Sequence, residues 1–265
     1  MTGIRKWLCL ALSALLLFSC AAFAEEDIEI EEIILNPDGS LPEPEATDPP
    51  AGRSARDSFI DDIIALGEEL YIKADGKAQR ASLKGDIYVC KNFTVYVFRQ
   101  NRDKYRMAEF PDLQLKIPNN MPEKQCRPYY YGYCWEEIPA SKGNPFVEAA
   151  QFLYDSKQSK EENRERALEF MRQVQRGDYL QMTGNYKGGI GAHSAIFISD
   201  YDPETNTVHS MDSNRKGTRI NGTRYGYVLF DSEMQIDEWV EFFCIKKRGA
   251  TLYRLRDDII FAGDN

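Results

Sequence analysis

The sequence predicts an α+β protein, and two patterns of apolar residues lead to that prediction. Near the start of the folded part, apolar residues recur at the three- and four-residue spacing of an amphipathic helix. In the second half of the chain, short apolar or alternating runs are separated by Gly, Pro, Asp and Asn, which is typical of antiparallel strands joined by turns. With 265 residues, the chain is long enough for one sizeable domain and a tail.

Residues 1–24 have the features of a secretory signal peptide. Arg5 and Lys6 precede an apolar run, and an Ala-Phe-Ala cleavage motif ends at Ala24. The apolar run is short for a bilayer span, so we expect no membrane span and a mature protein that is secreted or held in the cell envelope, outside the cytoplasm. The alternative is a bacterial lipobox around Cys20, which would give that residue a lipid anchor.

Residues 25–55 form an acidic, proline-rich segment that we expect to be a disordered tether. They hold ten acidic residues, one arginine and five prolines, and carry a net charge of −9. Such a composition buries too little apolar surface to fold. Residues 56–265 are expected to form one domain, whose formal net charge is only −2. Neither part has the basic stripe that nucleic-acid binding needs, so we expect no nucleic-acid partner.

The folded part is predicted to begin near Ser54 with a helix over residues 57–71. Its apolar positions fall on one helical face, at Phe59, Ile63, Leu66 and Leu70.

Residues 86–100 are ambiguous between strand and helix. Their β-branched and aromatic content favours a strand, whereas Phe93, Tyr96 and Val97 would share one face of a helix. In a helix, Cys90 would lie in the first turn, where unpaired N–H groups and the helix dipole stabilise a thiolate. Cys90 would then be a nucleophile; its alternatives are a buried apolar residue or half of a disulfide.

The chain has only two histidines, and both lie on predicted neighbouring strands. His193 opens the strand that follows a glycine-rich loop at residues 188–191, and His209 lies inside the next strand. Residues on the same face of adjacent antiparallel strands are in contact, so one imidazole could orient the other. Each histidine alone would be read as a core or surface residue, but the pair with Cys90 upstream favours catalysis.

This order of elements resembles the papain-like cysteine hydrolases of bacterial cell walls, the NlpC-type peptidases and the CHAP-type amidases. Cys90 opens an aromatic-rich segment, Gly177-Asp178 leads a strand, His193 opens the next strand, and Val208-His209 lies in the third. The resemblance implies a papain-like α+β fold, with N-terminal helices that carry the cysteine packed on an antiparallel sheet that carries the histidines. It therefore favours a helix for residues 86–100. NlpC-type enzymes usually have Asp-Cys-Ser-Gly at the nucleophile, where this chain has Val-Cys-Lys-Asn.

The resemblance also implies an activity and a catalytic set. The chain would be a secreted cysteine peptidase or amidase that hydrolyses amide bonds in the peptide stems of peptidoglycan, as a monomer and without a cofactor. Cys90 would be the nucleophile and His193 the base. The third residue would be His209 by alignment of the strand start, with Asp212 second and Asn214 a further candidate in the CHAP type.

Three other functions are weighed against this one. The fold could serve as an inactive wall- or protein-binding module, because the usual motif around the cysteine is absent. The same chemistry could act on another amide, as in a secreted transacylase. The two histidines and Asp212 could bind zinc, although Cys90 and the order of the elements fit the hydrolase better.

The remaining segments complete the expected fold. Residues 103–145 are rich in proline and are expected to be an insertion without long regular elements. Within it, Cys126 and Cys134 flank an aromatic loop, and a disulfide between them is the simplest pairing in a secreted protein. The aromatic loop is expected to be a wall of the cleft, or else a packed lid. Helices are expected at 145–154 and 160–175, and strands at 224–230, 239–245 and 251–256.

Overall fold

The computed structural model describes residues 53–81, 85–122, 124–126, 131–183, 192–246 and 248–263. The predicted signal peptide, the alternative anchor at Cys20, nearly all of the predicted tether and the glycine-rich loop at 188–191 lie outside these residues.

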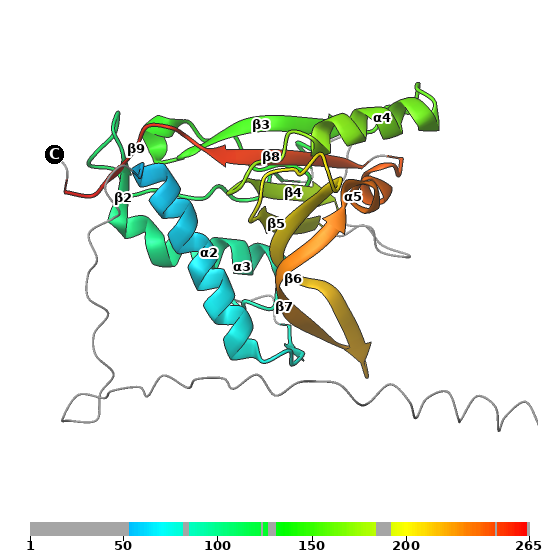
Figure 1. The fold of residues 1–265 in the computed structure, drawn as a ribbon, viewed down its shortest axis with the longest axis horizontal. Helices are drawn as coiled ribbons and strands as arrows, with labels where there is room; N and C mark the ends of the chain where they lie inside the picture. The colour runs from blue at the N-terminus through cyan, green and yellow to red at the C-terminus, as the bar shows by residue number, and fades with distance from the viewer. Residues whose placement is uncertain are drawn as a thin grey trace, which may run out of the picture. The chain divides into compact units, whose positions relative to one another are not determined.

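The described residues form an α+β structure with a seven-stranded antiparallel sheet and four helices, which confirms the predicted class (Figure 1). The order of the strands across the sheet is β1 (Gln79–Arg80), β7 (Thr223–Gln235), β6 (Thr207–Ile220), β5 (Ala192–Phe197), β4 (Tyr179–Thr183), β8 (Gly249–Leu255) and β3 (Phe146–Leu153). A second, two-stranded sheet pairs β2 (Tyr105–Met107) with β9 (Ile259–Phe261).

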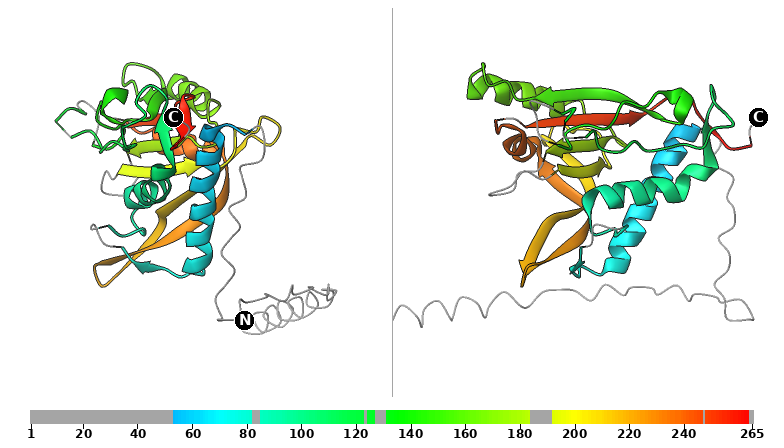
Figure 2. Two further views of the ribbon diagram at one scale, coloured as in Figure 1. Left: turned by 90° about the vertical axis from the view of Figure 1, so that its left-hand side faces the viewer. Right: turned by 180° about the vertical axis from the view of Figure 1, so that it is seen from behind.

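Two helices pack on one face of the large sheet and two on the other. Helices α2 (Ala55–Ala74) and α3 (Cys90–Asn101) contact each other, as do α4 (Lys160–Met171) and α5 (Ile236–Phe243). Figures 1 and 2 show α2 and α3 crossing beside the sheet, with α4 and α5 together at its other end. Two short 3₁₀ helices occur, η1 (Arg102–Lys104) at the start of the expected insertion and η2 (Ala140–Lys142) near its end.

Alternation along the central strands divides the interior into two cores. Ile196 packs with α2 and α3 in one core, whereas its neighbours Ala195 and Phe197 pack with α4 and α5 in the other. Successive side chains of a strand point to opposite faces, so each central strand contributes to both cores. This arrangement fixes which face of the sheet each functional side chain occupies.

The first two helices begin where local sequence signals place them. The hydroxyl of Ser54 accepts a hydrogen bond from the Asp57 N–H at the start of α2, 3.1 Å away, which satisfies one of the unpaired donors of the first turn. The ambiguous segment 86–100 is helical: α3 begins at Cys90, as the resemblance predicted. Val89 caps this helix without a side-chain hydrogen bond.

Two segments have the secondary structure opposite to the prediction. Residues 146–153 were expected to be helical but form β3, which pairs along its length with β8 at the edge of the sheet. Residues 239–245 were expected to be a strand, but residues 236–243 form α5. Its buried residues recur at helical spacing, at Ile236, Trp239, Val240 and Phe243.

Strands β6 and β7 form a long twisted hairpin that extends beyond the rest of the sheet (Figure 1). Its tip is Asn221-Gly222, with φ of 49° and 79°, and an Asn-Gly pair with two positive φ angles is the preferred two-residue hairpin turn. None of the helices in the described part of the chain combines the length and the apolar character that a bilayer-spanning segment needs.

Candidate active site

Cys90 and His193 meet where the start of α3 abuts the start of β5. The imidazole of His193 lies within hydrogen-bonding reach of the Cys90 thiol, and the sulfur also lies 3.8 Å from the Ala192 carbonyl oxygen. Both side chains are buried, with 7 % of Cys90 and 5 % of His193 exposed. Two residues that are about a hundred positions apart in the sequence therefore form one contact.

The environment favours charge separation between these two groups. Burial raises the pKa of the Cys90 thiol, but the charge and hydrogen bond of His193 and the N–H groups of Lys91 and Ser194 outweigh it, so the pKa is lowered. Burial lowers the pKa of His193, but Cys90 and Asp212 outweigh it, so that pKa is raised. Both directions favour a thiolate paired with an imidazolium.

Asp212 lies beside the His193 ring. Its Oδ1 is 3.7 Å from Nε2 of His193, and its Oδ2 is 3.0 Å from Nε of Arg215. The Asp212 carboxylate is fully buried, and neither contact has the geometry of a hydrogen bond. A buried carboxylate at this distance can hold the imidazolium by charge.

His209 is not part of this cluster. Its ring nitrogen Nδ1 lies 2.6 Å from Oδ1 of Asp231, at the half-exposed surface of β6 and β7. The N–H of Ile198 bonds to the His209 carbonyl, and Ile198 is five residues beyond His193 on the chain, roughly 16 Å at strand rise. Asp212 and His209 were the two main candidates for the residue that orients His193. The structure places Asp212 beside His193, whereas His209 lies beside Asp231.

Asn214, the further candidate, lies in the wall of a pocket beside His193. Its φ of 63° is left-handed, a conformation in which asparagine is enriched among non-glycine residues. It follows Asp212 at an irregularity in the pairing of β6 with β7.

Lys91, the residue after the cysteine, joins α3 to the insertion. Its ammonium donates to the Pro118 carbonyl at 3.1 Å and lies 4.3 Å above the centre of the Trp135 ring. Burial lowers the pKa of Lys91 from 10.5 to about 7, although Cys90 and Glu136 oppose that shift.

A buried amide fastens the aromatic part of the insertion beside the site. Oε1 of Gln181 accepts from the indole N–H of Trp135 at 3.2 Å and from the Ser194 hydroxyl at 2.6 Å. Nε2 of Gln181 donates to the Gly132 carbonyl at 2.5 Å. Gly132, at φ 93°, is so close to Ala192 that an added Cβ would lie 2.1 Å from the Ala192 Cβ. Residues 127–130 of the aromatic loop lie outside the described ranges, and at Gly132 the loop packs directly against the start of β5.

The expected disulfide within the insertion is not formed in the structure. Cys126 and Cys134 are buried thiols in one small cluster. The Cys126 thiol donates to the Met121 carbonyl at 3.4 Å, and the Cys134 thiol donates to the Met121 sulfur at 3.6 Å. Burial and the neighbouring Cys126 raise the pKa of Cys134 to about 12.

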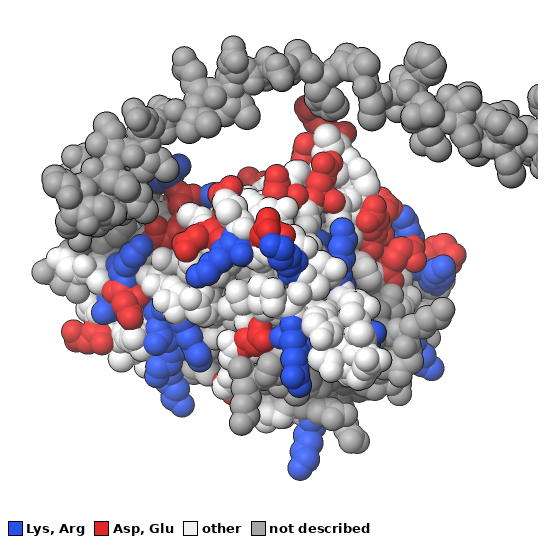
Figure 3. Space-filling view, turned by 90° about the horizontal axis from the view of Figure 1, so that it is seen from below, with Lys and Arg blue, Asp and Glu red and all other residues white. Residues whose placement is uncertain are grey.

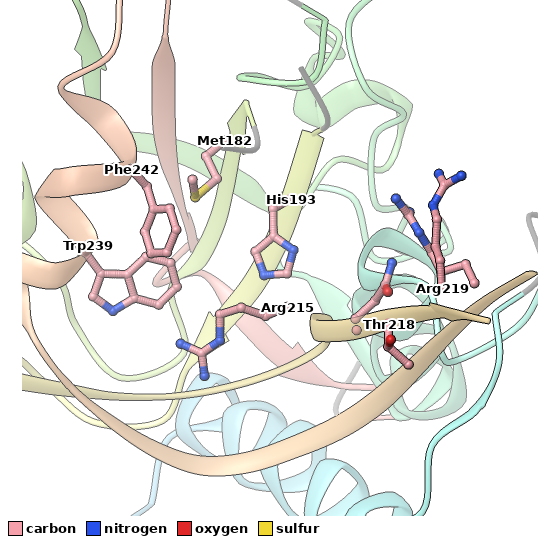
Figure 4. Close-up of a pocket in the computed structure, with 10 residues that line it drawn as sticks. Met182, His193, Arg215, Thr218, Arg219, Trp239 and Phe242 are labelled. Atoms are coloured by element: carbon pink, nitrogen blue, oxygen red, sulfur yellow. The ribbon is translucent and has the colours of Figure 1, made fainter. Parts of the chain in front are cut away.

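A pocket of about 320 Å³ opens beside His193 and contains residues that the sequence reasoning missed. In Figure 4, His193 lies between the apolar side chains of Met182, Trp239 and Phe242 on one side and Thr218 and Arg219 on the other. Arg215 and Arg224 also line it. The sequence does contain a pattern that could have pointed to the pocket, because residues 213–230 hold four basic residues and no acidic one.

Within the described ranges, no three histidine, cysteine or carboxylate side chains are grouped as a metal site would require. In comparisons with known proteins, no family model, curated protein or solved structure matches the chain.

Proposed function

We propose that the chain is a secreted cysteine hydrolase with a papain-like fold that cleaves amide bonds in peptidoglycan, as the likeness to the NlpC-type and CHAP-type enzymes implies. The observation that carries this proposal is the contact between the Cys90 thiol at the start of α3 and the His193 imidazole at the start of β5. Asp212, behind His193, completes a three-residue arrangement of nucleophile, base and orienting acid.

In the first half of the reaction, the Cys90 thiolate attacks the amide carbonyl carbon and a carbon–sulfur bond forms. The oxyanion that develops is stabilised by N–H groups at the start of α3, where each donor contributes about 3 kcal/mol. The carbon–nitrogen bond then breaks, and the His193 imidazolium gives its proton to the leaving nitrogen. The products of this step are a free amine and a thioester on Cys90.

In the second half, water attacks the thioester and His193 takes a proton from it. The carbon–sulfur bond breaks, a carboxylic acid leaves, and the thiolate–imidazolium pair is restored. Asp212 stabilises the imidazolium and orients its ring throughout, which is the role of the third residue in such a site. Each of these steps uses only this chain's side chains, its backbone N–H groups and water.

Substitution of Cys90 tests the proposal on purified peptidoglycan. The wild-type protein is expected to release new amino groups, and Cys90→Ser is expected to release none while keeping its melting temperature. Cys244→Ser is the matched control, because Cys244 is a half-buried thiol outside the site and its loss should leave the rate unchanged. Unaltered turnover by Cys90→Ser would exclude the mechanism.

The inactive binding module is separated from the enzyme by the reactivity of Cys90. A thiolate paired with His193 should react quickly with iodoacetamide near neutral pH. Labelling of the wild-type protein as slow as that of a free cysteine would favour the binding module. Fast labelling that is lost in His193→Ala would favour the enzyme.

A further inference from the structure

The pocket beside His193 differs in its lining from the outer surface of the molecule. On the face seen in Figure 3, acidic and basic side chains are interspersed. One wall of the pocket is instead apolar: Met182 and Trp239 are buried and Phe242 is half-buried. With about 320 Å³, the pocket falls within the range of about 300–1,000 Å³ that small-ligand sites occupy. An apolar wall of this kind favours a ligand with a hydrocarbon part.

The charged residues of the pocket do not decide its ligand. Arg215 forms an ion pair with Asp212 at 3.0 Å, and Arg224 also interacts within the chain. Arg219 is exposed, where water and salt screen its charge. The class of ligand therefore follows from the neutral groups of the wall, above all the apolar side chains and the amide of Asn214.

A bulge in β6 carries Asn214 into the pocket wall. From Ser213 to Gly217, β6 advances four positions, whereas their partners on β7 (228 and 226) are two positions apart, so β6 holds two extra residues. Bulges re-aim side chains and are common beside active sites. Asn214 adopts a left-handed φ of 63°, and an added Cβ at Gly217 would lie 2.8 Å from its Oδ1. The local backbone therefore departs from regular pairing where it places this amide.

The Asn214 amide is buried but makes no hydrogen bond within the described part of the chain. Only 6 % of the residue is exposed, and it lines the pocket. Buried polar side chains in native proteins almost always have a partner, and an asparagine amide offers two N–H donors and a carbonyl acceptor. A substrate group in the pocket would supply the partner that the fold leaves out.

The position of the pocket relates it to one half of the substrate. His193 lines the pocket, and in the proposed reaction it is the residue that protonates the leaving nitrogen. The residue that carries this nitrogen is therefore the part of the substrate nearest to the pocket. This step rests on the proposed function.

We propose that the pocket binds the residue that supplies the leaving nitrogen, and that it selects a neutral residue with an apolar side chain. Met182, Trp239 and Phe242 pack against that side chain, and the Asn214 amide donates a hydrogen bond to the carbonyl oxygen of the same residue. The substrate class is thus a peptide with an apolar residue directly after the scissile amide. A charged side chain at that position would lose its hydration against the apolar wall.

A series of synthetic stem peptides tests the apolar wall. The peptides differ only in the leaving residue, which is leucine, glycine or glutamate, and cleavage is followed by mass spectrometry. The wild-type protein is expected to cleave the leucine peptide with a kcat/KM about 10- to 100-fold above that of the glycine peptide, as burial of the leucine side chain implies. It should cleave the glutamate peptide no faster than the glycine peptide. Equal cleavage of the leucine and glycine peptides would overturn the subsite while leaving the hydrolase intact.

Phe242→Ala makes this test specific to the pocket. Removal of the ring opens one wall, so the preference for leucine over glycine should fall by about 3-fold or more. Phe230→Ala is the matched control, because Phe230 is also half-buried but lies beside Tyr71, with ring centres 6.2 Å apart, and does not line the pocket. It should keep the preference. An unchanged preference in Phe242→Ala would contradict the assignment of the pocket.

The hydrogen bond from Asn214 is tested by removing its acceptor. A substrate with leucine amide as the leaving group is compared with one that releases isopentylamine, which has the same hydrocarbon chain but no carbonyl. The wild-type protein should favour the leucine amide by about 2- to 10-fold, the range of one net hydrogen bond.

Asn214→Gly should cleave these two substrates equally, and glycine adopts the positive φ without strain. Asn221→Gly is the matched control, because Asn221 also has a left-handed φ, of 49°, but lies at the exposed tip of the same hairpin. It should discriminate as the wild-type protein does. Discrimination that persists in Asn214→Gly would show that this amide is not the donor.

A binding measurement separates the subsite from the chemistry. Calorimetry with Cys90→Ala compares the leucine and glycine peptides, which this variant cannot cleave. Tighter binding of the leucine peptide that is reduced in Cys90→Ala/Phe242→Ala would support the subsite even if the wild-type protein hydrolysed neither peptide, an outcome that would reject the proposed function alone. Equal binding of the two peptides, or binding of neither, would contradict the subsite.

Discussion

At the scale of single residues, the choice between Asp212 and His209 follows from strand geometry. Asp212 pairs directly with Ala195 of β5, and Ala195 is two residues from His193, so all three share one face of the sheet. His209 is an odd number of positions from Asp212 on the same strand and points to the other face. It meets Asp231 there instead of His193.

Paired substitutions at these two positions test that assignment. Asp212→Asn should lower kcat by about 10²- to 10⁴-fold with little change in KM, because it removes the charge that stabilises the imidazolium. His209→Gln should leave kcat/KM nearly unchanged and alter the free energy of unfolding by about 0.5 kcal/mol or less. Steady-state kinetics on one peptide substrate compare them, and the opposite ranking would make His209 the orienting residue.

The shifted pKa values of Cys90 and His193 predict the pH dependence. The rate of alkylation of Cys90 should reach half its maximum below pH 9.0, the ordinary pKa of the thiol, because that pKa is lowered. Hydrolysis also needs protonated His193, whose pKa is raised above 6.5. As the pH rises, kcat/KM should increase as Cys90 loses its proton and decrease once His193 loses its own.

His193→Ala is the control for that titration. Without the imidazolium, only burial and the backbone donors act on Cys90, and burial is the largest influence. The midpoint for alkylation should therefore move to higher pH. A midpoint that stays the same would show that His193 does not activate the sulfur.

The sequence was sufficient to predict that Cys90 and His193 lie together, but it left the third residue undetermined. Two histidines and a cysteine before an aromatic helix are visible as a pattern. The partner of His193 depends on the register of β6 against β5, which the turn at residues 198–206 sets. A one-residue change of register exchanges the faces of the strand, and no local pattern in β6 specifies that register.

At the scale of secondary-structure elements, the site depends on how closely the hairpin approaches the segment before α3. Gly226 of β7 faces this segment, and an added Cβ would lie 2.7 Å from the Tyr88 carbonyl oxygen and 3.3 Å from Oδ1 of Asn214. Tyr88 is two residues before Cys90. The absence of a side chain at Gly226 therefore lets the pocket wall approach the segment that leads to Cys90.

Gly226→Ala tests this close approach. The clash with a backbone oxygen should destabilise the fold by about 1–3 kcal/mol and should lower kcat by displacing the start of α3. Lys216→Ala, on the exposed surface of the same hairpin, should change neither quantity appreciably. Denaturant unfolding measures the free energy of unfolding, and single-turnover kinetics measure the rate of the chemical step. Full activity in Gly226→Ala would show that the site does not depend on the close contact between β7 and the segment before α3.

The two elements predicted wrongly also have physical reasons. Residues 236–243 contain aromatic and β-branched residues that suit a strand, but their burial follows the 3.6-residue period of a helix packed on α4. Residues 146–153 form a strand because β8 offers a partner along its whole length. Strand formation of this kind depends on a segment about a hundred residues away, and periodicity within the segment does not reveal it.

At the scale of the whole molecule, the insertion is held to α3 and the large sheet by contacts around Trp135. The indole ring lies under the Lys91 ammonium and donates to Gln181, and it stacks on Tyr253 of β8 with ring centres 4.1 Å apart. Cys134 immediately precedes this ring in the sequence. A covalent bond at Cys134 would therefore restrain the segment that packs beside His193.

Oxidative refolding tests whether Cys126 and Cys134 supply that restraint. The two thiols lie in the same buried cluster, so refolding in oxidising glutathione should join them and raise the free energy of unfolding by about 2–3 kcal/mol, as expected for a short closed loop. Protein folded under reducing conditions should oxidise slowly, because burial and Cys126 raise the pKa of Cys134 to about 12 and a thiol reacts only as thiolate. Peptide mapping under both conditions should find Cys90 as a free thiol, and Cys126→Ser/Cys134→Ser is the control that cannot form the disulfide. A disulfide to Cys90 in active protein would contradict both the pairing of Cys126 with Cys134 and the proposed role of Cys90 as nucleophile.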